Sequence, residues 1–320
     1  MERRKRLWAT VGLVALVIVD VALVFAALRI SSRSVDPGPT TPVTQTDAPT
    51  PSATSSTSTA PTTPPTTSST TTTAAAASVP LTSLVAAVDG SVAWRANVGA
   101  CTGGGGAVEL STDGGKTWRT RTPPYAVVTR IIPTDATKAS VVGADSACDM
   151  GVRSTTDGGG TWPGTGSLAD TLARDAKDNT KVRAPGGRTV APCGTVPVVD
   201  LARNSPTGAQ TLCADGRLRS STDDGATWSD AGNVPSALAL DSRLVGSAVT
   251  SFVARTVAGC EGVRLSTVVD GKVSDLGCAA VGSFEAGKVA LTAPTPQTGW
   301  LVVGTTTWRS SDGLKTWAKA

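Results

Sequence analysis

The sequence of 320 residues predicts an all-β fold, a β-propeller of about five four-stranded blades. The first observation is a box of eight residues that returns along the chain at 111–118, 155–162, 221–228 and, in a weaker copy, 310–317. The second is that each repeat holds about four short strand-like segments separated by turn residues, as a propeller blade requires. Because a unit of this size cannot bury its own apolar face, the copies are expected to stack around one axis.

The spacing of the boxes sets the expected number of blades. A fifth, eroded copy places Val268 at the aspartate position and Val273 at the tryptophan position, so that successive aspartate positions lie 44, 66, 45 and 44 residues apart. Five blades then occupy 78–320. The long interval carries 22 extra residues, about half a blade, which we interpret as an insertion, although a degenerate sixth blade stays open. Since a linker precedes the first repeat, no strand from the far N-terminus is expected to close the ring.

The first blade is expected to contain strands at 83–88, 91–98, 107–111 and 117–120, and the last at 288–293, 299–304, 306–309 and 316–319. The box forms the hairpin turn between the third and fourth strands. Its aspartate can bond backbone amides, its glycine can adopt a positive φ, and its tryptophan can be buried between blades. Trp94 and Trp300, at second-strand positions, are likewise expected in the core. The box residues expected to be structural are Asp113, Trp118, Asp157, Trp162, Asp223, Trp228, Asp312 and Trp317.

The boxes follow the pattern Ser/Thr-x-Asp-x-Gly-x-Thr-Trp, which resembles the Asp-box, or BNR, repeat. That family includes sialidases, sortilin-like receptors and photosystem II assembly factors, all β-propellers. The resemblance implies that the turn lies away from the ligand face. Three copies fit every fixed position, whereas the fourth has Leu314 where a glycine is expected, so its turn is expected to be altered. The Ala/Thr/Val/Gly/Arg-rich, Lys-poor composition indicates an actinobacterial member.

The N-terminal residues predict a membrane anchor. Residues 7–30 are apolar apart from Thr10, Asp20 and Arg29, and their 24 residues can cross a hydrocarbon layer of about 30 Å as a helix. The basic residues just before this run favour a cytoplasmic tail at 1–6. A cleaved signal peptide is the alternative, but its apolar core spans only about 7–15 residues and ends at small residues. We therefore expect an uncleaved signal anchor.

Residues 31–77 consist almost entirely of Thr, Ser, Pro and Ala. Such a tract has too few apolar side chains to offset the entropy of ordering, so it predicts a disordered linker. Its Ser/Thr-Pro density resembles that of O-glycosylated stalks. The expected location is a single-pass cell-membrane protein with a cytoplasmic N-terminus and an extracytoplasmic propeller.

The six cysteines all lie in the exported part, which favours disulfides. The repeat register places Cys101, Cys148, Cys213 and Cys260 at turns between second and third strands, and Cys193 and Cys278 near connections between blades. Since both kinds of turn share one face, the expected pairs are Cys101–Cys148, Cys193–Cys213 and Cys260–Cys278. The sequence has no histidine and no Cys-x-x-Cys pair, so neither a metal site nor a cofactor is expected.

The ionisable residues give little support to catalysis. A net charge of +4 is no footprint for nucleic acid, and the absence of histidine removes the commonest general base. The resemblance implies a sialidase site with a Tyr–Glu nucleophile, an Asp acid/base and three arginines. The one tyrosine, Tyr125, lies on the first blade-to-blade connection, whereas the family's nucleophile comes late in the chain. Residues 130–133 echo its Arg-Ile-Pro motif but follow the first box, and Glu109 fits a solvated strand face.

The extra segment, about 166–188, is the best candidate for recognition because long loops on rigid scaffolds often carry it. Its basic side chains could hold an acidic glycan or protein surface, or could be solvated and balanced by Asp170, Asp175 and Asp178. The candidate ligand-binding residues are Arg174, Lys177, Lys181, Arg183 and Arg188.

The sequence thus predicts a membrane-anchored, non-catalytic binding or assembly module for a protein or a cell-envelope glycan. The alternative is a sialidase-like glycoside hydrolase. That alternative requires an acid pair or a Tyr–Glu pair converging at the channel.

Overall fold

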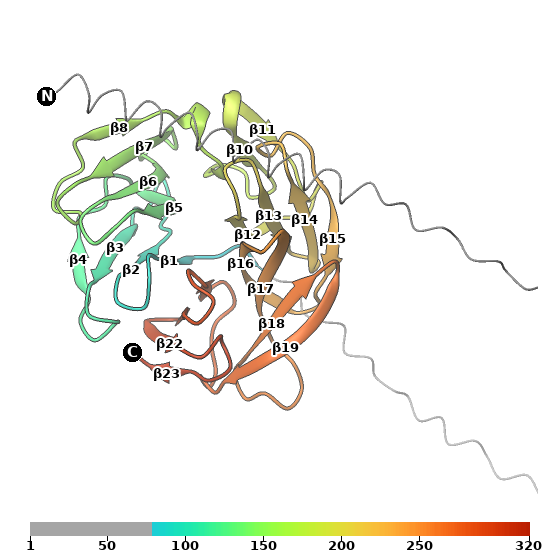
Figure 1. Ribbon diagram of the computed structural model, residues 1–320. Helices are drawn as coiled ribbons and strands as arrows, with labels where there is room; N and C mark the ends of the chain where they lie inside the picture. Colours follow the sequence, from blue (N-terminus) through green and yellow to red (C-terminus); the bar gives the residue numbers. More distant parts are fainter. Residues whose placement is uncertain (1–78) are drawn as a thin grey trace, which may run out of the picture. The chain divides into compact units, whose positions relative to one another are not determined.

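The computed structural model describes residues 79–320 (Figure 1). The tail 1–6, the membrane helix 7–30 and the linker 31–77 expected from the sequence lie outside these residues. Residues 79–320 contain no helix that is both long and apolar enough to cross a membrane. They fold into six antiparallel sheets, each built from strands that are consecutive in the chain.

The blades follow one another along the sequence. The first comprises β1 (Ser83–Ala87), β2 (Ala93–Asn97), β3 (Ala107–Ser111) and β4 (Arg119–Arg121), and the second β5 (Val127–Pro133), β6 (Ala139–Ala144), β7 (Met150–Thr155) and β8 (Gly164–Gly166). The third comprises β9 (Ala173–Arg174), β10 (Val182–Ala184) and β11 (Arg188–Val190), with the one-turn 3₁₀ helices η1 (Leu168–Asp170) and η2 (Pro185–Gly187).

The last three blades each have four strands. The fourth comprises β12 (Val198–Arg203), β13 (Ala209–Cys213), β14 (Arg217–Ser221) and β15 (Ser229–Asn233), and the fifth β16 (Ala237–Val245), β17 (Ala248–Arg255), β18 (Val263–Val269) and β19 (Lys272–Ala279). The sixth comprises β20 (Val289–Thr292), β21 (Gly299–Val303), β22 (Thr306–Ser310) and β23 (Ala318–Lys319).

The described part is therefore a six-bladed propeller, and the interpretation of the long interval as an insertion is wrong. That interval holds the three-stranded third blade. The chain leaves β9 toward Asn179, whose carbonyl accepts a hydrogen bond from the Val198 nitrogen at the start of β12. At the other end of the third blade, Arg188 begins β11 and donates to the carbonyl of Asp224, at the opposite end of the fourth blade. β9 thus runs opposite to the neighbouring innermost strands. The third blade lacks both a first strand and a box, which explains its half-length.

The ring closes through contacts between innermost strands. β1, β5, β9, β12, β16 and β20 touch in that order, and β20 returns to β1. The segment before β1 also takes part, because Leu81 donates its N–H to the carbonyl of Val199 and Thr82 donates to Gly287. The last blade takes all four of its strands, β20 to β23, from the C-terminal end of the chain.

The four boxes form the same turn. In the first, Ser111 Oγ accepts from the Gly115 nitrogen at 2.9 Å, and Asp113 accepts from both the nitrogen and the hydroxyl of Thr117 at 3.0 and 2.6 Å. These bonds, the hydroxyl bond foremost, lower the pKa of Asp113 to about 2. We call the end of the propeller where the four boxes lie the box face.

The fourth turn keeps this geometry, contrary to expectation. Leu314 donates its N–H to Ser310 Oγ at 3.0 Å, and Thr316 bonds Asp312 as Thr117 bonds Asp113. Leu314 adopts a φ of 68° and is only 2% exposed. Burial of its side chain in the core offsets the strain of a left-handed backbone.

Disulfides join Cys101–Cys148, Cys193–Cys213 and Cys260–Cys278, the pairs expected from the register. The innermost strands of the four-stranded blades begin at this end of the propeller, opposite the box face. We call it the disulfide face. The first disulfide links the β2–β3 loop of one blade to the β6–β7 loop of the next, so it couples two blades covalently.

Candidate functional site

The five basic residues expected to bind a ligand do not gather in one place. Arg174 lies in β9 and its side chain is buried in the central channel. Lys177 lies near the disulfide face, where it pairs with Asp149 at 3.3 Å, and Lys181 lies close by, just before β10. Arg183 pairs with Asp175, while Arg188 lies toward the box face. The third blade thus distributes these charges over both faces and the axis.

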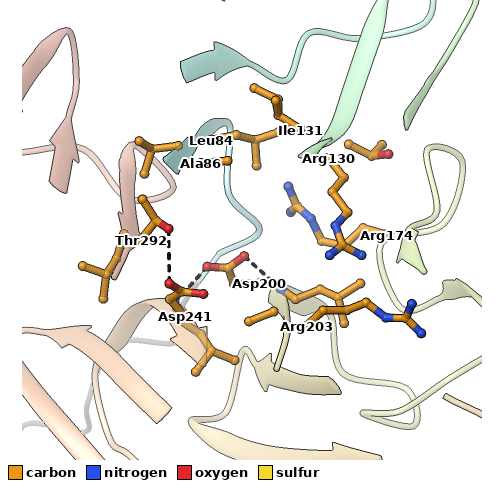
Figure 2. A pocket seen from close by; sticks show the side chains of 15 residues that line it. Leu84, Ala86, Arg130, Ile131, Arg174, Asp200, Arg203, Asp241 and Thr292 are labelled. Carbon is orange, nitrogen blue, oxygen red and sulfur yellow. Dashed lines mark hydrogen bonds between the residues drawn. The ribbon is translucent and has the colours of Figure 1, made fainter. Parts of the chain in front are cut away.

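The central channel contains a cavity of about 150 Å³ that is lined by all six innermost strands. Figure 2 shows that arginine and aspartate side chains point into it from one part of the wall, while Leu84, Ala86 and Ile131 cover another. A cavity of this size is smaller than the roughly 300–1,000 Å³ of ordinary ligand pockets. It has room for several waters or for one small polar group. Its charged residues are Arg130, Arg174, Asp200, Arg203 and Asp241.

Two arginines connect consecutive blades across this channel. Arg130 of the second blade donates from Nη1 to the carbonyl of Leu172 in the third blade at 2.6 Å. Arg174 of the third blade donates from Nη1 to Val199 in the fourth and from Nη2 to Leu81, each at 3.1 Å. Burial lowers the pKa of both, in the case of Arg130 to about 10. The Arg130 guanidinium therefore stays charged at neutral pH.

Two aspartates continue the series. Asp200 of the fourth blade accepts from the Leu240 nitrogen of the fifth at 2.8 Å, and Asp241 of the fifth accepts from the Ala293 nitrogen after β20 at 2.6 Å. The other oxygen of each carboxylate accepts from the next residue in its own strand, Leu201 or Ser242. All four carboxylate oxygens thus already hold a backbone N–H.

Burial raises the pKa of Asp200 to about 6, although Arg174 and the two backbone N–H groups favour the charged form. Burial also raises the pKa of Asp241. These groups satisfy backbone atoms at the open inner edges of the strands, where no further strand can pair. The innermost strands of the second, third, fourth and fifth blades therefore each send one charged side chain to the next blade.

Sequence reasoning missed this series. A detectable signal existed, since Arg130, Asp200 and Asp241 each interrupt an apolar innermost strand. A buried charge in such a run requires polar partners. The partners are backbone atoms of other blades. The sequence could therefore indicate which positions carry a buried charge, but not which backbone atoms those charges bond.

The sialidase arrangement implied by the family resemblance is not assembled. Tyr125 packs over Gly143 and Gly151 of the second blade, and its charged neighbours are Arg153 and Asp145. Glu109 pairs with Arg95 at 2.7 Å in the first blade. An acid pair, Asp200 and Asp241, does line the channel. Within residues 79–320 no group of His, Cys, Asp or Glu could hold a metal ion.

A second pocket, of about 290 Å³, lies at the disulfide face. Its wall includes Leu81, Gly99, Cys101 and Val127, and it shares Thr129 and Arg174 with the channel cavity. The lining is mainly apolar. The first disulfide therefore braces the rim of this pocket.

No family model and no curated protein matches the chain. Among solved structures it is similar to YCF48 bound to D1 peptide, with 18% identity, coverage of 77% of this chain and 81% of that one, and a TM-score of 0.38. YCF48 from Cyanidioschyzon merolae is 14% identical, with coverage of 76% of this chain and 86% of that one and a TM-score of 0.38. Aleuria aurantia lectin in complex with Fucα1-6GlcNAc is 9% identical, with coverage of 77% of this chain and 96% of that one and a TM-score of 0.48. The strand order of the chain's own sheets makes it a six-bladed β-propeller.

Proposed function

We propose that this protein is a non-catalytic binding or assembly module whose partner is a protein or a cell-envelope glycan. In this proposal an N-terminal membrane helix and a long linker hold the propeller on the extracytoplasmic side of a cell membrane. Three disulfides are compatible with that oxidising location.

The observation that carries the proposal is the use of the channel charges. A hydrolase needs one carboxylate free to attack or to activate water and another free to protonate the leaving group. Here every carboxylate oxygen of Asp200 and Asp241 accepts a backbone N–H, and each residue links two blades. Since movement of either carboxylate would leave buried N–H groups without partners, both are better suited to structure than to chemistry.

The disulfide face is the proposed binding surface. Its loops are braced by three covalent links, which lowers the entropy lost when a partner orders them. The pocket of about 290 Å³ can accept an apolar side chain, and Lys181, next to Asp175 of its wall, adds positive charge, whereas Lys177 is paired with Asp149. We therefore expect a partner with an apolar anchor flanked by acidic or polar groups.

Glycoside hydrolysis is the second candidate, because the pKa of Asp200 near 6 leaves part of this carboxyl protonated at neutral pH, as an acid catalyst requires. Hydrolysis of any glycoside that is lost in Asp200→Asn, with the fold retained, would favour this candidate.

Face-specific photocrosslinking tests the binding proposal. A photoreactive residue replaces Gly103, an exposed position in the β2–β3 loop of the disulfide face, or Lys116, an exposed position in the box turn of the same blade. Gly103 accepts a side chain, since an added Cβ would meet only Ala100 at 3.9 Å. In the native envelope, position 103 should give a discrete adduct that position 116 does not. An adduct from position 116 alone, or equal adducts from both, would contradict the proposal.

A further inference from the structure

A groove of about 480 Å³ lies on the box face between the fourth and fifth blades. It is larger than the channel cavity and falls within the size range of ligand pockets. Serines and small residues form much of its wall, with Val249 and Val268 supplying the apolar part. The polar side chains that matter below are Gln210, Ser220, Asp230, Ser251 and Asp270.

The groove exists because the fifth blade has no box. At two other junctions, the box of one blade closes against a tryptophan in the second strand of the preceding blade. Gly115 lies against Trp300 and Gly159 against Trp94, so closely that an added Cβ would lie 3.0 and 3.2 Å from the indoles. The box tryptophans add edge-to-face contacts, with centroids 6.3 and 6.2 Å apart. These junctions leave no room for a ligand.

Both parts of that junction are replaced between the fourth and fifth blades. Strands β18 and β19 are joined by the tight turn Asp270–Gly271 in place of the eight-residue box. In β13, Gln210 pairs with Ser220 at the register position where Trp94 pairs with Leu110. A glutamine thus stands where two other blades place an indole, and the missing volume becomes the groove.

The groove retains hydrogen-bonding groups without partners. Gln210 is 4% exposed, and its Oε1 accepts from Ser251 Oγ at 2.5 Å, but its NH₂ group donates to no atom of residues 79–320. Because Gln210 lines the groove, its amide can donate to a ligand that brings an acceptor. Asp270 forms no hydrogen bond or ion pair within the same residues, so its carboxylate is available to a donor. Asp230 is paired with Arg219.

We propose that this groove binds a neutral saccharide unit. The amide of Gln210 can donate to an acceptor and the exposed carboxylate of Asp270 can accept from a donor, and a sugar hydroxyl provides both. A guanidinium or ammonium group only donates and would leave the Gln210 amide without a partner. An acidic sugar or phosphate would meet the negative charge of Asp230 and Asp270. The aliphatic Val249 and Val268 can contact the C–H face of the ring.

This site is separate from the surface assigned to the partner, since it lies on the opposite face of the propeller and on other blades. Either proposal can therefore fail alone. Loss of sugar binding would leave the position-103 adduct unchanged, and absence of that adduct would say nothing about the groove.

Saturation-transfer NMR on the full-length chain tests the inference. The probes are the methyl glycosides of glucose, galactose and mannose, which cover both configurations at C2 and C4. N-acetylneuraminic acid serves as the anionic comparison and acetyl-arginine methyl ester as the cationic one. At least one neutral glycoside should receive saturation and the charged probes should not. Absence of transfer to all three at about 50 mM, where even millimolar binding is saturated, or preference for a charged probe, would overturn the proposal.

Two substitutions place the binding in the groove. Asp270→Asn keeps the turn, because asparagine tolerates the φ of 49° found there, and should weaken binding about tenfold through loss of a charged acceptor. Gln210→Trp introduces the indole that the first and sixth blades carry at this position and should abolish binding. Glu261→Gln, an equal change of charge at the disulfide end of the fifth blade, should leave binding unchanged. Unchanged binding in a folded Asp270→Asn variant would refute the assignment even if Gln210→Trp failed to fold.

Discussion

Asp200 accepts a hydrogen bond from the backbone nitrogen of Leu240 at 2.8 Å, and this contact links the innermost strand of the fourth blade to that of the fifth. Arg174 makes the corresponding link from the third blade by donating to Val199. The arginines of the second and third blades donate, whereas the aspartates of the fourth and fifth blades accept. In every case the side chain of one blade bonds the backbone of the next blade along the chain. Charges that resemble a catalytic cluster thus also close the scaffold.

The pH dependence of stability should report the buried Asp200 carboxyl. Its folded-state pKa, about 6, exceeds the usual value of 3.8, so between these values the folded chain holds more protons than the unfolded chain. The free energy of unfolding should therefore fall as pH rises from about 4 to about 6, by roughly 3 kcal/mol from this group. Asp200→Asn cannot titrate at this position and should not show this fall. The difference in free energy of unfolding between the wild type and Asp200→Asn should therefore decrease by a similar amount from pH 4 to pH 6. Denaturant unfolding at several pH values measures it.

Asp113→Asn is the matched control for this experiment. Hydrogen bonds from Thr117 hold the folded pKa of Asp113 near 2, below the usual 3.8, so its contribution is lost only as pH falls through that range. The difference between this variant and the wild type should stay constant from pH 5 to 8. A flat difference for Asp200→Asn as well would show that the carboxyl is not raised.

Arg174→Lys should destabilise the propeller. Two guanidinium nitrogens reach two backbone carbonyls, Val199 and Leu81, and a lysine cannot span both. Loss of a hydrogen bond from a charged donor reduces the free energy of unfolding by about 2–3 kcal/mol. The exposed Arg188→Lys should change it by less than about 0.5 kcal/mol. Equal effects of the two substitutions in urea unfolding would argue against the inter-blade role.

Leu314 should show an unusual order of substitutions. Leu314→Ala removes a buried side chain and should lower stability by about 2–5 kcal/mol, while the left-handed φ of 68° remains strained. Leu314→Gly loses the same side chain but relieves about 1 kcal/mol of that strain. Glycine should therefore be the more stable variant in thermal unfolding. A more stable alanine variant would mean that the turn does not adopt this backbone.

Replacement of both Cys101 and Cys148 by serine opens a loop with a sequence separation of 47, against 18 for Cys260 and Cys278. The entropic model gives losses of about 4 and 3 kcal/mol for loops of these sizes. The first pair also braces the proposed binding pocket, so its removal should weaken the position-103 adduct as well. Urea unfolding and crosslinking of the two double variants test both statements. An unchanged adduct in the variant without Cys101–Cys148 would show that this disulfide is not needed for binding.

Periodicity made much of the fold predictable. The boxes fixed the register of four blades and thereby the face on which the cysteines lie, and the Cα–Cα separations of 5.3, 5.7 and 5.8 Å meet the geometry that a disulfide requires. The third blade was not predicted because it has neither a box nor a first strand, and its β9 and β11 contain only two and three residues. So short a strand has no recognisable period of its own. Contacts with the neighbouring blades define it.

The candidate sites were less accessible to sequence reasoning. Arg174 was singled out for its charge, yet its buried position follows from the reversed direction of β9. The groove between the fourth and fifth blades depends on two losses, a missing box and a missing tryptophan, more than 50 residues apart in the chain. The erosion of the fifth box was visible in the sequence, whereas its coincidence with Gln210 required the strand register.

The most direct test of the central claim is partner capture from position 103 by chains that carry Asp200→Asn or Asp241→Asn, with folding checked by circular dichroism. If the channel carboxylates serve the scaffold, folded variants should capture the partner as fully as the wild type while unfolding at lower denaturant concentration. Abolished capture by a folded variant of normal stability would place the channel carboxylates in the function itself and contradict the account.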